Sequence, residues 1–405
     1  MKRALFYIIA VLYALFSPGL VQAEDPPSFL ATWGSNGSGN GEFNYPYGIA
    51  VDSQHRVYVA DMENHRIQKF DSDGNFLLPW GSLGSGNGEF DYPVRIAVDS
   101  QDRVYVADYS NDRIQKFDSD GNFLTTWGSY GSGNGKFSGP YGIAVDSQDR
   151  VYVADSFNYR IQKFDSDGNF LLTWGSLGSG NGKFNYPVGI AVDSQDRVYA
   201  ADALNYRIQK FDSDGNHLTT WGSYGSGNGE FYGPYDIAVD SQDRVYVVDT
   251  WNSRIQKFDS DGNFLATWGS LGSGNGEFNY PYGIAVDSLD RIYVADTQNN
   301  RIQVFGYPPT GIADQPTVRP QLTVSCYPNP FNPSTTISYT VPKSGAVTLT
   351  VYDVTGKLVA RLVDRTFQTV GLHDVEYRHP GASGVYFARL TVGGQSRTVK
   401  LVILK

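Results

Sequence analysis

Six pairs of oppositely charged residues have the types and the spacing that could do chemistry. In each pair an Asp is followed five positions later by an Arg, and the pairs are Asp61 and Arg66, Asp108 and Arg113, Asp155 and Arg160, Asp202 and Arg207, Asp249 and Arg254, and Asp296 and Arg301. Each pair could be catalytic, but a reaction needs unlike groups to converge at one place. Six like pairs at equal intervals therefore predict one structural ion pair or hydrogen-bonded bridge in each of six repeats.

Histidines are the next residues that could carry chemistry, as ligands of a catalytic zinc or as members of a Ser-His-Asp arrangement. There are five, namely His55, His65, His217, His373 and His379. A catalytic zinc takes two or three of them at one place, whereas these five fall in unrelated positions of the repeats and of the C-terminal part. We therefore expect no metal, no cofactor and no catalytic triad.

The Asp and Arg pairs belong to a repeat of 47 residues that fills the first three quarters of the chain. A Trp marks each repeat, at Trp33, Trp80, Trp127, Trp174, Trp221 and Trp268. In the third copy four short runs of β-forming residues, 141–146, 151–155, 160–165 and 170–175, are separated by turn sequences at 147–150 and 166–169. A period in the forties built from short strands predicts a β-propeller with one four-stranded blade per repeat.

The number of strands indicates how the ring closes. Six copies of the first three strands end at Phe305, but only five copies of the fourth strand lie between them. The sixth copy, Phe29 to Gly34, stands alone near the N-terminus. We expect it to complete the last blade beside Arg301 to Phe305, which also removes two exposed sheet edges.

The repeats resemble a known family. The pattern P-x-G-I-A-V-D, V-Y-V-A-D, N-x-R-I-Q-K-F and G-S-G-N-G-x-F is similar to the NHL repeat in all six copies. The resemblance implies a six-bladed propeller and one of several functions, which are protein binding, RNA binding in some cytoplasmic members and zinc-dependent lyase activity in a secreted branch. The net charge of −10 argues against a nucleic-acid partner, because phosphate binding needs clustered Lys and Arg.

Both ends of the chain carry export features. Residues 1–23 have Lys2 and Arg3 before a short apolar run and end in Val21-Gln22-Ala23, which predicts a signal peptide cut after Ala23. No other segment is long and apolar enough to cross a membrane. The mature protein, expected to be a monomer, therefore leaves the cytoplasm.

A linker and a second domain follow the repeats. Residues 306–321 hold four Pro and form the linker, and 322–405 are rich in Val and Thr, which predicts a small immunoglobulin-like β-sandwich. The runs 327–333, 351–357, 384–387 and 400–405 resemble the C-terminal sorting domain of type IX secretion. That resemblance implies passage through the type IX machinery to the surface of a bacterium with an outer membrane. The alternative is an ordinary immunoglobulin-like domain.

The repeats differ mainly on one face of the expected ring. The first and third turns of each blade point to one face and are nearly invariant. The loops after the second strand and the starts of the innermost strands point to the other, which we call the variable face. On it Arg95 and Asp236, in opposed blades two and five, are candidate polar anchors. The candidate stacking residues are Phe157, Tyr159, Tyr206 and Trp251.

Exposed aromatic rings beside charges suit a protein, peptide or glycan ligand. The sequence therefore predicts a secreted or cell-surface binding or scaffold propeller. The alternative function is a secreted propeller enzyme, a lyase, lactonase or glycan-active enzyme, that uses the same face. Drift after recent duplication would also explain the variation among the loops.

Overall fold

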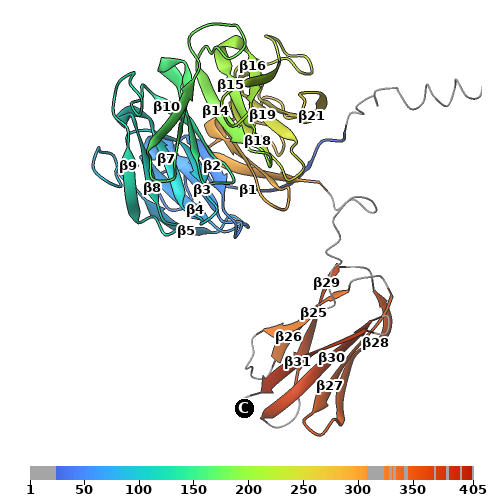
Figure 1. The fold of residues 1–405 in the computed structure, drawn as a ribbon. Coiled ribbons are helices and arrows are strands. Elements are labelled where there is room, and N and C mark those ends of the chain that lie inside the picture. The colour runs from blue at the N-terminus through green and yellow to red at the C-terminus, as the bar shows by residue number, and fades with distance from the viewer. Residues whose placement is uncertain are drawn as a thin grey trace, which may run out of the picture. The chain divides into compact units, whose positions relative to one another are not determined.

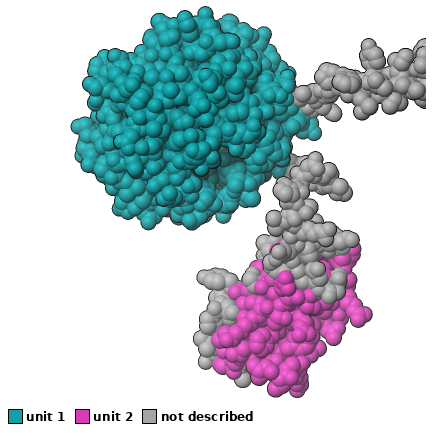
Figure 2. Space-filling view, viewed as in Figure 1, with its two compact units in different colours: residues 1–309 teal, residues 310–405 magenta. Residues whose placement is uncertain are grey.

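The computed structural model describes residues 24–307 and, nearer the C-terminus, 323–327, 331, 334–341, 345–368, 371–379, 383–392 and 395–403. The chain forms two compact units, which divide between Pro309 and Thr310 (Figure 2). The predicted signal peptide and all but the first two residues of the predicted linker lie outside the described residues. Each unit is described by itself.

The described part of the first unit folds into six antiparallel sheets of four strands, which follow one another around a ring (Figure 1). Blade 1 comprises β2 (Pro46–Val51), β3 (Val57–Asp61), β4 (Arg66–Phe70) and β5 (Phe76–Trp80), and blade 2 comprises β6 (Pro93–Val98), β7 (Val104–Asp108), β8 (Arg113–Phe117) and β9 (Phe123–Trp127). Blade 3 comprises β10 (Pro140–Val145), β11 (Val151–Asp155), β12 (Arg160–Phe164) and β13 (Phe170–Trp174), and blade 4 comprises β14 (Pro187–Val192), β15 (Val198–Asp202), β16 (Arg207–Phe211) and β17 (His217–Trp221). Blade 5 comprises β18 (Pro234–Val239), β19 (Val245–Asp249), β20 (Arg254–Phe258) and β21 (Phe264–Trp268), and blade 6 comprises β22 (Gly283–Val286), β23 (Ile292–Asp296), β24 (Arg301–Gly306) and β1 (Ser28–Trp33).

The N-terminal strand closes the ring as predicted. β1 pairs antiparallel with β24, with Phe29 opposite Phe305 and Trp33 opposite Ile302. The centroid of the Trp33 ring lies 6.3 Å from that of Tyr293 in its own blade and 6.0 Å from that of Phe70 in blade 1. One side chain therefore joins the last blade to the first across the seam of the ring.

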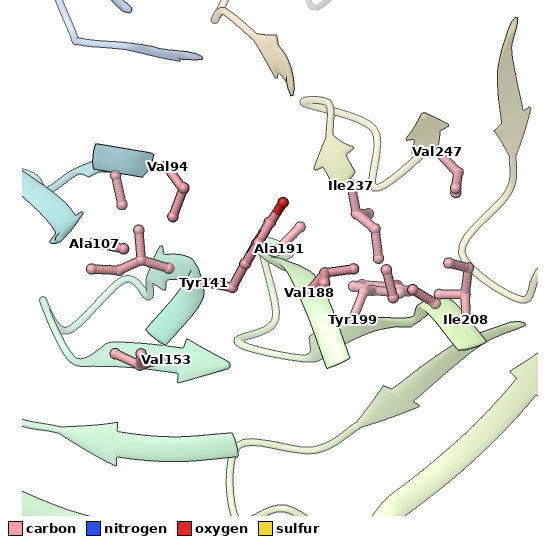
Figure 3. Close-up of a cluster of buried hydrophobic side chains, with 14 of the residues drawn as sticks. Val94, Ala107, Tyr141, Val153, Val188, Ala191, Tyr199, Ile208, Ile237 and Val247 are labelled. Atoms are coloured by element: carbon pink, nitrogen blue, oxygen red, sulfur yellow. The ribbon is translucent and has the colours of Figure 1, made fainter. Parts of the chain in front are cut away.

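Apolar side chains fill the spaces between neighbouring blades. The second strand of each blade is buried at every position, because both faces of its sheet are covered. Figure 3 shows one such cluster, to which Val94 of blade 2, Val153 of blade 3, Ile208 of blade 4 and Ile237 of blade 5 contribute. Burial of this kind is the main source of stability for the ring.

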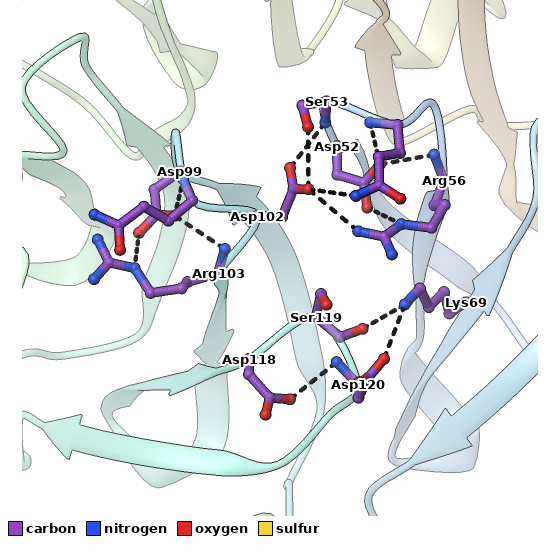
Figure 4. Close-up of polar contacts among 12 residues, drawn as sticks. Asp52, Ser53, Arg56, Lys69, Asp99, Asp102, Arg103, Asp118, Ser119 and Asp120 are labelled. Carbon is purple, nitrogen blue, oxygen red and sulfur yellow. Dashed lines mark hydrogen bonds and ion pairs between the residues drawn. The ribbon is translucent and has the colours of Figure 1, made fainter.

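Hydrogen bonds tie adjacent blades together on the nearly invariant face (Figure 4). Asp102 of blade 2 accepts hydrogen bonds from the backbone N–H and the hydroxyl of Ser53 in blade 1, both at 3.0 Å. Lys69 of blade 1 donates to the carbonyl of Ser119 in blade 2 at 2.5 Å. The Asp contact recurs at the next four junctions, and at the seam His55 replaces this Asp, with its Nδ1 3.4 Å from Asp287.

The second unit is a β-sandwich. One sheet has the order β25 (Thr323–Tyr327), β26 (Ser334–Val341) and β29 (Gly371–Arg378). The other has the order β28 (Leu358–Gln368), β27 (Gly345–Asp353), β30 (Gly384–Val392) and β31 (Gln395–Ile403). Ile337 from the first sheet and Leu349, Leu390 and Leu401 from the second belong to its buried core.

Candidate ligand-binding site

The six Asp and Arg pairs hold the loops of the variable face in place. In every blade the Arg Nε lies 2.7 Å from Oδ2 of the buried Asp. In blade 5 Asp249 also accepts a hydrogen bond from the backbone N–H of Tyr232, and Arg254 donates to the carbonyls of Ser226, Gly227 and Glu230. Each pair thus fastens the connector that enters its blade to the loop after the second strand.

Arg95 and Asp236 lie at the centre of the ring. The Nε of Arg95 is 3.3 Å from Oδ1 of Asp236, and the two residues are 3% and 5% exposed. Arg95 also donates to the carbonyls of Tyr235 and Tyr282 at 2.9 Å and 2.8 Å. The two candidate polar anchors are therefore buried and paired with each other, because the innermost strands of opposed blades bring them into contact.

Electrostatics favour the charged form of Arg95. Burial is the largest influence and opposes its charge, but the groups around the guanidinium, Asp236 first among them, together outweigh burial and raise the pKa of Arg95. The guanidinium also lies over the rings of Tyr47 and Tyr141, at 5.0 Å and 5.3 Å from their centroids. Its hydrogen bonds, ion pair and ring contacts reach four other blades, so Arg95 links the blades at the centre of the ring.

Glycine at the corresponding position of the other four blades has a steric cause. A Cβ on Gly142 would lie 1.9 Å from the carbonyl oxygen of Val188, and one on Gly283 would lie 2.1 Å from that of Tyr47. The innermost strands thus approach each other too closely for a side chain in these four blades. Two blades depart from this rule, and their two side chains fill the centre.

Tyrosines surround the buried pair on the side of the variable face. Tyr47, Tyr141, Tyr235 and Tyr282 come from the starts of four innermost strands, and Tyr47 stacks on Tyr282 with centroids 4.4 Å apart. The hydroxyls of Tyr47 and Tyr141 are hydrogen-bonded to each other. Burial raises the pKa of Tyr235 to about 12, so this phenol stays protonated at neutral pH.

Four further rings form what we call the blade 4/5 aromatic cluster, namely Tyr206, Tyr224, Tyr232 and Trp251. The centroids of Tyr206 and Tyr224 are 5.0 Å apart, those of Tyr224 and Tyr232 are 5.4 Å apart, and those of Tyr232 and Trp251 are 4.7 Å apart. Tyr224 is 64% exposed and Tyr232 is 39% exposed. The ring centroid of Trp251 also lies 5.7 Å from that of Tyr235, one of the four tyrosines that surround the Arg95 and Asp236 pair, which we call the central tyrosines.

The structure separates the four predicted stacking residues into three places. Tyr206 and Trp251 belong to the blade 4/5 aromatic cluster. Phe157 is 48% exposed and contacts Tyr109 and Tyr186 on the other side of the central tyrosines. Tyr159 packs instead against the buried residues between blades 3 and 4.

Tyr224 and Tyr232 were missed because they lie in the connector between blades, 222–233, whose glycines indicate structure. A comparison of the six connectors at both positions together distinguishes this junction. At the position of Tyr224 the other copies have Asn36, Leu83, Tyr130, Leu177 and Leu271, and at the position of Tyr232 they have Asn44, Asp91, Ser138, Asn185 and Asn279. Only the junction of blades 4 and 5 has an aromatic residue at all four positions of the cluster.

Among the described residues no three His, Cys, Asp or Glu side chains gather as a metal site. His55 and His65 both belong to blade 1, where His55 lies in the turn between β2 and β3 and His65 in the loop between β3 and β4, whereas His217 lies on the outer strand of blade 4. The described segments also include no helix that is long and apolar enough to cross a bilayer.

Comparison with known families decides what kind of protein this is. The NHL repeat family matches residues 43–70, 90–117, 137–164, 184–211, 231–258 and 278–305, one span for each blade. The secretion system C-terminal sorting domain matches residues 325–404. The chain is an NHL-repeat protein with a C-terminal sorting domain. The sorting domain indicates interaction with the type IX secretion machinery, and secretion or cell-surface attachment in a bacterium with an outer membrane.

Curated relatives match this NHL-repeat protein over about one repeat. Protein lin-41 from Caenorhabditis elegans is 54% identical over 46 residues, which are 11% of this chain and 4% of that protein. NHL repeat-containing protein 3 from Homo sapiens is 49% identical over 47 residues, which are 11% of this chain and 14% of that protein. The matches thus span only a small part of either relative.

Solved structures share the propeller of the NHL-repeat protein. A protein of unknown function from Bacteroides thetaiotaomicron is 22% identical, with 68% of this chain and 76% of that one covered and a TM-score of 0.54. Virginiamycin B lyase from Staphylococcus aureus is 15% identical, with 69% and 100% covered and a TM-score of 0.50. A gluconolactonase from Xanthomonas campestris is 15% identical, with 72% and 98% covered and a TM-score of 0.50. At these identities the likeness shows the fold alone.

Proposed function

We propose that this secreted NHL-repeat protein is an extracellular binding module, and that its ligand lies on the blade 4/5 aromatic cluster. One observation carries the proposal. In a ring of nearly identical repeats, one junction alone has aromatic residues at all four positions, and two of these rings are well exposed. Exposed rings that contact one another provide a large, rigid contact area at low entropic cost.

The form of the ring supports binding at a surface rather than inside a channel. Arg95 and Asp236 occupy the centre and are paired with each other. A ligand that approaches the variable face therefore meets the exposed rings of the aromatic cluster, Tyr224 and Tyr232. The Asp249 and Arg254 pair holds the connector and the loop that present these rings, so the site is largely formed before the ligand arrives.

Arrays of glycans and of random decapeptides test this function. The mature protein should bind at least one array member, and Tyr224→Ala should weaken that binding by about tenfold, because Tyr224 is an exposed ring of the cluster. Tyr130→Ala is the matched control, since Tyr130 occupies the same connector position between blades 2 and 3. Equal binding by the wild-type protein and the Tyr224 variant would contradict the proposal.

A further inference from the structure

We infer that the ligand of the blade 4/5 aromatic cluster is a neutral glycan, an inference that rests on the function proposed above. The cluster offers rings and phenol hydroxyls as its recognition groups. Sugar rings present C–H faces that stack on aromatic rings and hydroxyls that bond to phenols. Main-chain groups around the cluster already have hydrogen-bond partners, which disfavours a peptide. The cluster has few unpaired charges, which disfavours an acidic polymer.

Most backbone groups that surround the cluster already have partners. In the connector the carbonyl of Gly225 accepts a hydrogen bond from Asn252, and those of Ser226, Gly227 and Glu230 accept hydrogen bonds from Arg254. The amides of Gly227 and Gly229 donate to Glu230 and Gln256.

The loop of blade 5 is engaged in the same way. The backbone N–H of Trp251 donates to the carbonyl of Tyr232, and the backbone N–H of Tyr232 donates to the carboxylate of Asp249. A peptide is commonly recognised through main-chain hydrogen bonds at a free sheet edge. The variable face consists of loops and connectors, so it offers no such edge, and recognition there falls to the side chains.

The loops and the connector that form the cluster contain few charged side chains. The loops of blades 4 and 5, 203–206 and 250–253, have no charged residue, and connector 222–233 has only Glu230, whose carboxylate accepts a hydrogen bond from Gly227. Arg207 and Arg254 are paired with Asp202 and Asp249. The chain as a whole carries a net charge of −10, which disfavours acidic polymers. The two loops and the connector that form the cluster therefore offer no cation to an acidic sugar.

The arrangement of the rings suits a ligand with both flat faces and hydroxyls. Tyr224 and Tyr232 are inclined at 86° to each other, and Tyr232 and Trp251 are inclined at 65°. Steeply inclined rings expose faces in more than one direction, so neighbouring units of a sugar chain can each meet a ring. The three phenols of the cluster can donate hydrogen bonds as well as accept them.

Calorimetric titration of the mature protein tests this ligand class. The neutral probes are cellohexaose, maltohexaose, xylohexaose, mannohexaose and chitohexaose, the acidic probe is hexagalacturonate, and the peptide probe is a mixture of random decapeptides. At least one neutral hexasaccharide should bind at least about tenfold more tightly than hexagalacturonate. Trp251→Ala and Tyr224→Ala should each weaken it by about tenfold, whereas Tyr130→Ala should change it by less than about twofold. The exposed Tyr224 keeps the test valid if the Trp251 variant does not fold.

The outcomes separate the inference from the function on which it rests. Binding of peptides at the cluster without binding of any neutral hexasaccharide would overturn the glycan inference and keep the binding function. Equal binding of hexagalacturonate would overturn the preference for neutral sugars. A neutral hexasaccharide whose binding is unchanged in both cluster variants would overturn the inference and the proposed site together, as would the absence of any binding in all three groups of probes.

Discussion

Arg95 in blade 2 and Asp236 in blade 5 meet at the centre of the ring, with the Nε of Arg95 3.3 Å from Oδ1 of Asp236. They are 141 positions apart in the chain, and the other four blades have Gly where these residues stand. The pair therefore breaks the sixfold symmetry of the repeats by forming one contact between opposed blades. Each residue is almost fully buried, so each depends on the other for its charge.

Removing one partner of this pair should destabilise the ring more than removing both. Arg95→Gly leaves a buried carboxylate unpaired, which should lower the free energy of unfolding by about 3 kcal/mol. The double variant Arg95→Gly with Asp236→Gly gives all six blades the same residue and should lose less than either single variant. Urea unfolding of the four proteins measures the coupling. Additive losses would show that the two side chains act independently.

The seam of the ring should depend on Trp33. This ring contacts Phe70 in blade 1 and Tyr293 in blade 6, so Trp33→Ala removes packing from both sides of the seam. We expect a loss of about 3 kcal/mol in the free energy of unfolding. Leu30→Ala on the same strand is the control, because Leu30 is 53% exposed and should change stability by less than about 0.5 kcal/mol. Equal losses in the two variants would argue against closure through Trp33.

Glu24 takes the place of a missing turn. In blades 1 to 4 the Lys of the third strand donates to a Ser carbonyl in the third turn of the next blade, as Lys210 does to Ser260. Blade 6 has no such turn, and Lys257 of blade 5 pairs with the carboxylate of Glu24 instead. The Lys257 side chain is fully buried, so loss of Glu24 leaves its charge without this partner.

Glu24→Ala should therefore lower the free energy of unfolding by about 2 kcal/mol, less than for a fully buried pair because Glu24 is partly exposed. Adding Lys257→Met should recover about half of this loss, since no buried charge remains. Asp25→Asn, at the exposed neighbouring position, serves as the control. Thermal or urea unfolding measures these differences. A Glu24→Ala variant as stable as the wild-type protein would show that the contact with Lys257 does not stabilise the ring.

Acid should weaken the third turns. Slight burial opposes the effect at Asp118, but hydrogen bonds from Asn122 and from the backbone of Asp120 outweigh it and lower the pKa of Asp118 (Figure 4). A carboxyl group with a lowered folded-state pKa contributes stability above its ordinary pKa of about 3.9 and loses that contribution as the pH falls through the folded-state pKa. The difference in unfolding free energy between wild type and Asp118→Asn should be constant above about pH 5 and shrink below about pH 4. A difference that does not vary with pH would contradict this account.

Much of the fold follows from local pattern. The 47-residue period, the turn sequences and the unmatched strand near the N-terminus predict six blades and their closure, because each blade uses the same short-range rules. The contact between Arg95 and Asp236 could not be predicted in the same way. It depends on how closely the innermost strands approach, which the clash of a Cβ on Gly142 with Val188 makes visible only in three dimensions.

Only part of the candidate site could be predicted from the sequence, because the rest also depends on contacts that form in three dimensions. Tyr206 and Trp251 stand out because the loops after the second strand vary among the repeats. Tyr224 and Tyr232 were passed over because the glycine-rich connectors look structural, although folding brings connector and loop together through Asp249. Tyr159 follows the same pattern as Tyr206 in the sequence, yet it packs between two blades.

Hydroxyl-radical footprinting of the mature protein with saturating neutral hexasaccharide tests the central claim most directly, because it reads the exposure of individual Tyr and Trp side chains. The account predicts lower oxidation of Tyr206, Tyr224, Tyr232 and Trp251, with no change at Tyr130. Unchanged oxidation of these four side chains, or equal protection of Tyr130, would contradict it.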